Sequence, residues 1–446
     1  MRKYFHSLSP THHLPITHFM FSRHPEPKLQ FAWNSAQLGL ILLPFVPALG
    51  AVILVISLFA TWQQQYRRII RYPLNQGFGL LSLLLIITTC FAWNKSEALL
   101  GLCNFLPFFL FFAAFSVLVQ TPAQLKRISE ILVVSSLPIV LIGMGQLFLG
   151  FTTSEIWQSL FGWAIAPGGN PVGRMASVFM YANILAGYLV IVFILALGLW
   201  LAQWKQYHRH LPLSPRFLFL SVTVILDFVG LILTNSRNAW AIAILACFAY
   251  AVYQGWRLIV LGVSTITTTI LLAAFAPNPI ASSLRQFVPA FFWARLNDQM
   301  YPDRPVALLR QTQWNFALSM CKERPIVGWG LRNFTEIYQA KMNIWLGHPH
   351  NLYLMLAAET GIFATLLFCA LLIWIVVDGV KVLFQEQYLQ TEDKLLFFSY
   401  LLVTTAWILF NTVDVTIFDI RLNTISWLLI GAMVGAGIGK RGKVYF

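Results

Sequence analysis

Residues 182–203 read ANILAGYLVIVFILALGLWLAQ, and none of these 22 side chains is charged. At 1.5 Å per residue, a helix of this length crosses the roughly 30 Å hydrocarbon core of a bilayer. Over all 446 residues, 58% are hydrophobic and 10% are charged, and the mean hydropathy is +0.70. These values exclude a water-soluble domain, so the sequence predicts an all-α, polytopic membrane protein.

Nine further apolar runs are long enough to span a bilayer: 77–93, 98–119, 130–150, 215–234, 238–253, 258–276, 351–377, 395–412 and 421–439. The run 36–62 contains Pro44, Pro47 and Gly50, and basic residues flank it on both sides. Because basic residues favour the cytoplasmic side, this run is interpreted as a hairpin of two short helices. The expected fold therefore has about twelve transmembrane helices.

The connections between these runs follow the positive-inside rule. They place 18 basic residues inside, and only Lys95, Arg174, Arg237 and Arg421 in the short outer loops. The net charge of +14 is therefore attributed to topology and to an anionic inner leaflet, not to nucleic acid. The expected organisation is a cytoplasmic tail at 1–35, transmembrane helices 1–9 at 36–276, a large extracytoplasmic loop at 277–349, transmembrane helices 10–12 at 350–439, and a cytoplasmic tail at 440–446.

The large loop is the one extramembrane segment long enough to fold. Apolar residues over 305–321 are spaced loosely like those of an amphipathic helix, which a turn at 325–330 would end. Cys321 is the single cysteine of this loop, and the other four cysteines fall inside apolar runs. Neither a disulfide framework nor a thiolate metal site is expected.

The predicted topology brings Arg174, Arg237, His348 and His350 to the same outer face. Arginines can bind a diphosphate or carboxylate through bidentate bonds, and a neutral imidazole can accept a proton from a hydroxyl. Simpler roles compete: an arginine at a membrane edge can cap a helix or reach the headgroups. The histidines could bond loop carbonyls beside Asn351, a suitable N-cap. Two histidines without a nearby carboxylate make a metal site a minor alternative.

Four acidic residues need separate interpretation. Asp227 and Glu359 lie deep in predicted spans, where an acid marks a proton or ion path or pairs with another helix. Asp414 and Asp419 lie in the last outer loop, where local pairing with Arg421 is expected.

Several motifs in the chain resemble those of the O-antigen ligase family of membrane glycosyltransferases, with the likeness running over roughly residues 75–440. The motifs are Trp314–Leu318, Pro325–Gly330, Asn333-Phe334, and His348-Pro349-His350-Asn351 followed by Glu359 and Gly361. Gly173-Arg174 and Leu233–Arg237 are weaker parallels. Family members often have Asn-Pro-Asn where this chain has Met180–Asn183, and Gly-Gly or Gly-Ala where it has Asn238-Ala239.

The resemblance implies a metal-independent enzyme without a cofactor, in a bacterial inner membrane. It would move a glycan from a polyprenyl-diphosphate carrier to a lipid or glycan acceptor, as in lipopolysaccharide biosynthesis. His350 is the expected catalytic residue and His348 a second candidate. The expected substrate-binding residues are Arg174, Arg237, Arg310 and Asn351.

Other functions stay open from the sequence. A polysaccharide polymerase of the same family would differ in its acceptor. Phe418–Arg421 resembles a cyanobacterial branch that has been linked to inorganic-carbon transport, so a solute transporter is a second alternative. A transporter would also need broken helices and an inverted repeat, which the sequence does not display. A structural or scaffold protein is a third.

Overall fold

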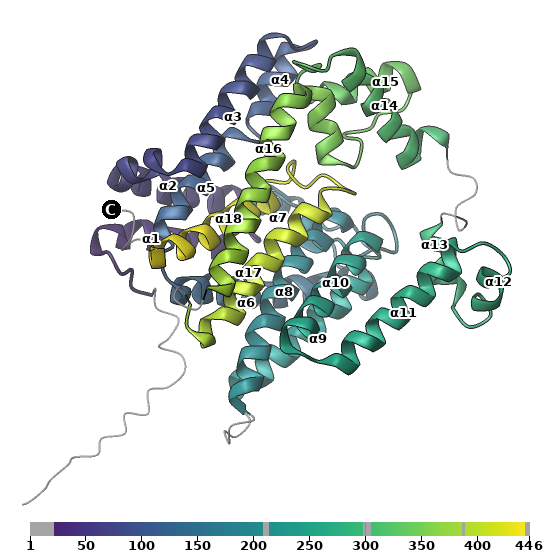
Figure 1. Ribbon diagram of the computed structural model, residues 1–446, viewed down its shortest axis with the longest axis horizontal. Coiled ribbons are helices and arrows are strands. Elements are labelled where there is room, and N and C mark those ends of the chain that lie inside the picture. Colours follow the sequence, from purple (N-terminus) through teal and green to yellow (C-terminus); the bar gives the residue numbers. More distant parts are fainter. Residues whose placement is uncertain (1–21, 208–213, 298, 300–304, 386–388, 442–446) are drawn as a thin grey trace, which may run out of the picture.

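Among the residues that the computed structural model describes, ten helices are long and apolar enough to cross a membrane. Figure 1 shows how the helices are arranged. The structure describes residues 22–441 except 208–213, 298, 300–304 and 386–388, and these described residues contain helices and no strand. Most of the expected tail at 1–35 and residues 442–446 lie outside them. The spanning helices are α2 (Pro47–Arg71), α3 (Pro73–Cys90), α4 with α5 (Lys95–Leu102 and Leu106–Leu118), α6 (Pro122–Phe148), α8 (Ala182–Tyr207), α9 (Pro215–Leu233), α11 (Arg257–Phe275), α16 (Leu352–Phe384), α17 (Thr391–Phe410) and α18 (Ile420–Arg441).

The hairpin expected at 36–62 is present, and ten of the roughly twelve expected spans are among these helices. Its two helices are α1 (Gln30–Leu42) and α2, and Gly50 packs so closely that a Cβ would lie 2.4 Å from Cα of Leu43. With 13 residues, α1 is about 20 Å long, shorter than the hydrocarbon core. The second expected span outside the ten is α10 (Arg237–Gln254), whose polar residues at both ends lower its mean hydropathy.

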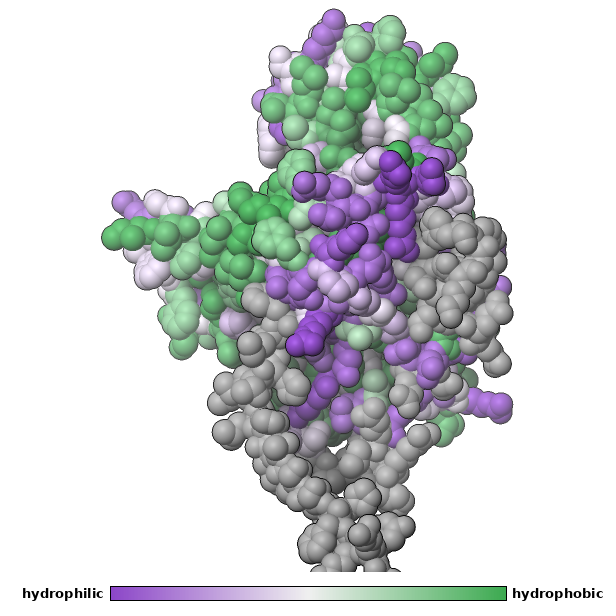
Figure 2. Space-filling view, turned by 90° about the vertical axis from the view of Figure 1, so that its left-hand side faces the viewer, coloured by the Kyte–Doolittle hydropathy of each residue, from purple (hydrophilic) through white to green (hydrophobic). Residues whose placement is uncertain are grey.

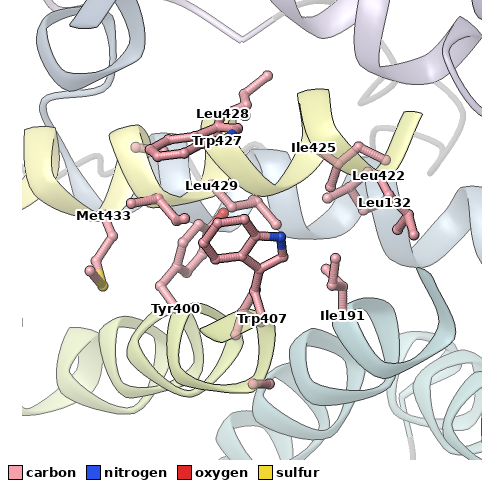
Figure 3. Packing of buried hydrophobic residues seen from close by; sticks show 14 of the residues in the cluster. Leu132, Ile191, Tyr400, Trp407, Leu422, Ile425, Trp427, Leu428, Leu429 and Met433 are labelled. Atoms are coloured by element: carbon pink, nitrogen blue, oxygen red, sulfur yellow. The ribbon is translucent and has the colours of Figure 1, made fainter. Parts of the chain in front are cut away.

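The centre of the bundle is α18, whose spanning window is 94% buried. Trp427 on this helix contacts the rings of Phe78, Phe112 and Trp407 with centroids 5.4, 6.1 and 5.5 Å away. Figure 3 shows Trp407 reaching from α17 toward α18, with Trp427 on α18. Gly431 lets α18 approach α5, because a Cβ there would lie 2.7 Å from the carbonyl oxygen of Phe112. Close aromatic packing therefore fixes the position of α18.

The opposite extreme is α11, whose window is 11% buried. In Figure 1 this helix lies at the edge of the molecule and leads to the short helices α12 (Ile280–Leu284) and α13 (Ala290–Leu296). The expected amphipathic helix at 305–321 is present as η4 (Val306–Leu308) and α14 (Arg310–Glu323). Together with α15 (Asn333–Met342) it forms a small second core around Phe316, Phe334 and Tyr338.

This second core is fixed to the bundle where α16 is interrupted. Gly361 has φ +82°, and the adjacent segment 325–330 bonds to the backbone there: Trp329 N to Ala358 O at 3.0 Å, Gly330 N to Glu359 O at 2.7 Å and Ile362 N to Pro325 O at 2.8 Å. A Cβ on Gly361 would lie 2.1 Å from the carbonyl oxygen of Ile326. Only glycine permits this approach, so the loop and α16 form one unit.

A polar network lies at the end of the bundle that the charge pattern assigns to the cytoplasm. Glu26 accepts hydrogen bonds from Gln65 at 2.9 Å and Gln120 at 2.6 Å, and it pairs with Arg68 at 3.7 Å. The segment that precedes α1 is thus attached to α2 and to the connection between α5 and α6.

Figure 2 shows the side of the molecule drawn on the left in Figure 1, where hydrophilic residues form a band beside large hydrophobic surfaces.

Candidate functional site

Asp414 is the residue that joins the segments of the candidate site. It lies in the loop between α17 and α18, and its side chain is 8% exposed. One carboxylate oxygen, Oδ1, accepts hydrogen bonds from Nδ1 of His350 at 3.0 Å and from the backbone N–H of Val415 at 2.9 Å. The other, Oδ2, accepts one from Nδ2 of Asn183 at 3.0 Å. Three segments distant in sequence therefore meet at one carboxylate.

The histidine-containing loop is held in a specific conformation. His350 has φ +53°, a left-handed conformation uncommon for a residue with a side chain. Asn351 caps α16 as expected, accepting a hydrogen bond from Leu354 N at 3.0 Å. Trp314 on α14 donates its indole N–H to Pro349 O at 3.0 Å. Asn351 therefore caps α16, and this role does not prevent His350 from bonding to Asp414.

Hydrogen bonds assign a tautomer to both imidazoles. A carboxylate accepts hydrogen bonds only, so Nδ1 of His350 bears the proton and Nε2 keeps a lone pair. The backbone N–H of His350 donates to Nδ1 of His348 at 3.1 Å, so in neutral His348 the proton is on Nε2. That nitrogen lies 4.0 Å from Oδ1 of Asp414, beyond hydrogen-bond distance. Of the two, His350 is the imidazole that a carboxylate orients.

Charge at the site follows from burial and from these contacts. Burial lowers the pKa of His348 to about 4, and nearby His350 and Arg310 also lower it against the opposing effect of Asp414. Burial by itself would raise the pKa of Asp414, but the hydrogen bond from His350 and the charges of His348, His350 and Arg310 lower it to about 2. At neutral pH the site therefore combines a neutral His348 with an ionised Asp414.

Arg174 is connected to the same carboxylate through Asn183. Its Nε donates to the carbonyl oxygen of Thr234 at 2.9 Å, and a terminal nitrogen donates to Oδ1 of Asn183 at 2.5 Å. Gly169 makes the turn before Arg174 feasible, since a Cβ at Gly169 would lie 2.2 Å from the carbonyl oxygen of Arg174. Although Asn-Pro-Asn is absent from this chain, Asn183 links the arginine to Asp414.

Two helix N-termini meet beside Asp414. Arg310, the first residue of α14, and Asn238, the second of α10, both donate to the carbonyl oxygen of Val413, the latter at 3.4 Å. Arg237 is the first residue of α10, and its side chain lines an apolar groove between α10, α11 and α13. Helix N-termini have partial positive charge. These residues make the surroundings of Val413 favourable for an anion.

One expectation about the last loop is wrong. Asp419 does pair with Arg421 at 3.0 Å, but Asp414 takes part in the site instead. Arg421, 2% exposed, donates to the carbonyl oxygen of Val178 at 2.7 Å and lies over the ring of Phe179. It therefore fixes the segment that follows Arg174. The sequence did not assign Asp414 or Asn183 to the site, because no motif spacing connects either residue to His350.

The two deep acids contact neighbouring helices. Asp227 on α9 accepts from the hydroxyl of Ser136 on α6 at 3.2 Å. Glu359 on α16 accepts from the backbone N–H of Phe334 at the start of α15, at 3.1 Å. Asp227 and Glu359 therefore each connect two helices, the second of the two roles expected for them.

The statement that no carboxylate lies near the histidines is also wrong. His348, His350 and Asp414 each offer a ligand atom, and the three atoms lie within 4.8 Å of one another. A cation bound there would have to replace the proton between His350 and Asp414 and the proton on Nε2 of His348.

Fold and site together define a polytopic, all-helical membrane protein with a His–Asp pair and several arginines at one end of its helices. Residues 222–369, about a third of the chain, match the model of the O-antigen ligase family. The match is narrower than the 75–440 expected from the motifs. It includes Arg237, Arg310, His348 and His350, whereas Arg174, Asn183 and Asp414 lie outside it. A comparison with curated proteins found no match.

Proposed function

We propose that the protein transfers a glycan from a polyprenyl-diphosphate carrier to an acceptor hydroxyl at the outer face of the bacterial inner membrane. The observation that supports this most directly is the hydrogen bond of 3.0 Å between His350 Nδ1 and Asp414. It leaves Nε2 of His350 as a base, the arrangement that general-base catalysis requires. Both chain termini would lie in the cytoplasm.

In this reaction, Nε2 of His350 accepts the proton of the acceptor hydroxyl while the hydroxyl oxygen attacks the anomeric carbon. The bond between that carbon and the diphosphate oxygen breaks, and the carrier diphosphate departs with the electron pair. Direct displacement inverts the anomeric centre. Asp414 holds the imidazole in the required tautomer and stabilises the imidazolium that forms.

The departing diphosphate gains negative charge, which the cationic groups near Val413 are suited to stabilise. Arg174, Arg237 and Arg310 are the proposed diphosphate-binding residues, with help from the N-termini of α10 and α14. Asn351 serves by fixing the backbone next to His350. The reaction as written needs no metal, and a chelator is expected to leave activity unchanged.

The experiment is replacement of His350 by Ala and, separately, of Arg237 by Ala, with surface glycan analysed on gels. His350→Ala is expected to lose about 10²- to 10⁴-fold, the contribution of a general base. Arg237→Ala is expected to lose about 10²- to 10³-fold, as when one group that stabilises developing charge is removed. Arg67→Ala is the matched control. Arg67 lies near the C-terminal end of α2, outside the candidate site, and bonds to its neighbour Tyr66. Intact glycan together with loss of bicarbonate uptake would favour a transporter. Chain elongation in place of transfer to lipid would identify the polymerase of the same family.

A further inference from the structure

A groove of about 540 Å³ lies between α10, α11 and α13, next to the site but outside the residues that meet at Asp414. Its walls are mainly apolar and aromatic, with Trp240 and Phe248 from α10 and Phe291 from α13. On α11 the wall includes the small Ser264 and Thr267 as well as larger aliphatic residues such as Leu271. The small residues on both helices, Ala241 on α10 and Ser264 and Thr267 on α11, leave room for a slender apolar ligand.

The groove has a polar end and an apolar end. Arg237 lines it at the first residue of α10, and Phe248 lines it eleven positions further along the same helix. At 1.5 Å per residue this distance is about 16 Å, close to half of the roughly 30 Å hydrocarbon core. The groove thus extends through about one leaflet, from the arginine inward.

One side of the groove faces the bilayer. Ile244 and Leu245, which line it, are 48% and 52% exposed, and α11 is the least buried of the spanning helices. A lipid chain can therefore enter sideways between α10 and α11 without leaving the membrane.

The polar end adjoins the reaction site. Asn238, the residue after Arg237, donates to the carbonyl oxygen of Val413, which precedes Asp414. An anionic headgroup at Arg237 would accordingly lie beside the site while its chain occupied the groove. We propose that this groove binds the isoprenoid segment nearest the diphosphate of the lipid-linked donor. This inference rests on the function proposed above.

A groove of one leaflet's depth contacts only the first part of a long polyprenyl chain. The remainder stays in the bilayer and adds no contact with the protein. Donor affinity is expected to increase with chain length until the groove is filled, and then to remain constant.

The test measures binding of a polyprenyl diphosphate to the purified full-length protein in phospholipid nanodiscs. Thr267→Trp fills the groove from α11, and Ala241→Phe fills it from α10. Ile266→Trp is the matched control, because Ile266 is the neighbouring residue, 63% exposed, and does not line the groove. Both groove variants replace residues at an open surface, and thermal unfolding checks that each is folded.

We expect at least about tenfold weaker binding for both groove variants, equal to about 1.4 kcal/mol, and unchanged binding for Ile266→Trp. Competition by inorganic diphosphate should be the same in all three proteins. If the groove variants bind polyprenyl diphosphate as Ile266→Trp does, the groove holds bilayer lipid only and the inference is overturned, while the proposed function stands. If inorganic diphosphate does not compete even in the unmodified protein, the proposed function fails and the inference fails with it.

Discussion

Asp414 illustrates how a single carboxylate can organise a site at the residue scale. Its two oxygens accept hydrogen bonds from His350, Asn183 and the backbone of Val415, so it is fully engaged although nearly buried. A buried charge is tolerated when its hydrogen bonds are satisfied. The same bonds orient the proposed base.

Replacing Asp414 by Asn should lower glycan transfer by at least about a hundredfold. Asn would remove the negative charge that stabilises the imidazolium, and its amide could favour the wrong tautomer of His350. The measurement is the transfer rate of the purified protein at saturating donor. Asp419→Asn is the control, because Asp419 pairs with Arg421 instead. Equal rates in both variants would exclude a role for Asp414 in orienting the base.

The lowered pKa of His348 predicts a pH dependence of stability. Its pKa is about 4 in the folded protein and about 6.5 when unfolded. Between these values the unfolded state binds more protons, so stability falls as the pH falls from about 6.5 to about 4, by up to about 1.4 kcal/mol per pH unit. The His348→Gln variant should lose less stability over this range, as measured by thermal unfolding in detergent.

Asp414 acts in a separate pH window and so serves as an internal comparison. Its folded pKa is lowered to about 2, so its stabilising contribution persists above the unfolded value of about 3.9 and is lost as the pH falls towards 2. A His348→Gln profile that matches the unmodified protein between pH 6.5 and 4 would contradict the assignment for His348.

At the scale of elements, the residues before α16 contact this helix at two places: at its interruption and just before its first turn. Segment 325–330 pairs with the backbone around Gly361, and Trp314 of the same loop region holds Pro349. The loop that follows α13 is therefore a support for His350. Arg421 has the equivalent role on the other side, where it holds the segment after Arg174.

Substitution of Gly361 by Ala should destabilise the protein by more than about 1–3 kcal/mol, the usual cost of such a backbone conformation for a residue with a side chain. The added Cβ would also meet the carbonyl oxygen of Ile326 at 2.1 Å. Gly79→Ala is the control, because nothing lies within 4 Å of its Cβ position and alanine suits a helix interior. Thermal unfolding of both purified variants gives the comparison. Equal stabilities would show that the loop and α16 separate easily.

For the whole molecule, the main question is which side of the membrane each end of the bundle faces. The basic residues near Arg67 and the polar site near His350 lie at opposite ends of the expected topology. In a cysteine-free background, Trp345→Cys should react with a membrane-impermeant thiol reagent in intact spheroplasts. Arg67→Cys should react only after lysis. The reverse pattern would place the proposed site in the cytoplasm.

Much of the helical architecture could be read from the sequence, because apolar length and basic flanks are local properties. The runs at 182–203 and 351–377 correspond to α8 and α16, and Pro44 and Pro47 correctly indicated the break between α1 and α2. Two expected spans are not among the ten candidates: α1 is short, and α10 has polar residues at both ends. Counting runs does not reveal which helix crosses the hydrocarbon core.

The residue types of the candidate site were also readable: a His-Pro-His-Asn run and arginines that the charge pattern brings to one side. The tertiary structure alone decided that Asp414, 64 residues after His350, accepts a hydrogen bond from Nδ1 of that histidine. It alone decided that Asn183 links Arg174 to the same carboxylate. It also decided that α11 stands far enough from α10 to leave a groove at Arg237. Contacts between distant residues depend on helix packing, which local sequence patterns do not encode.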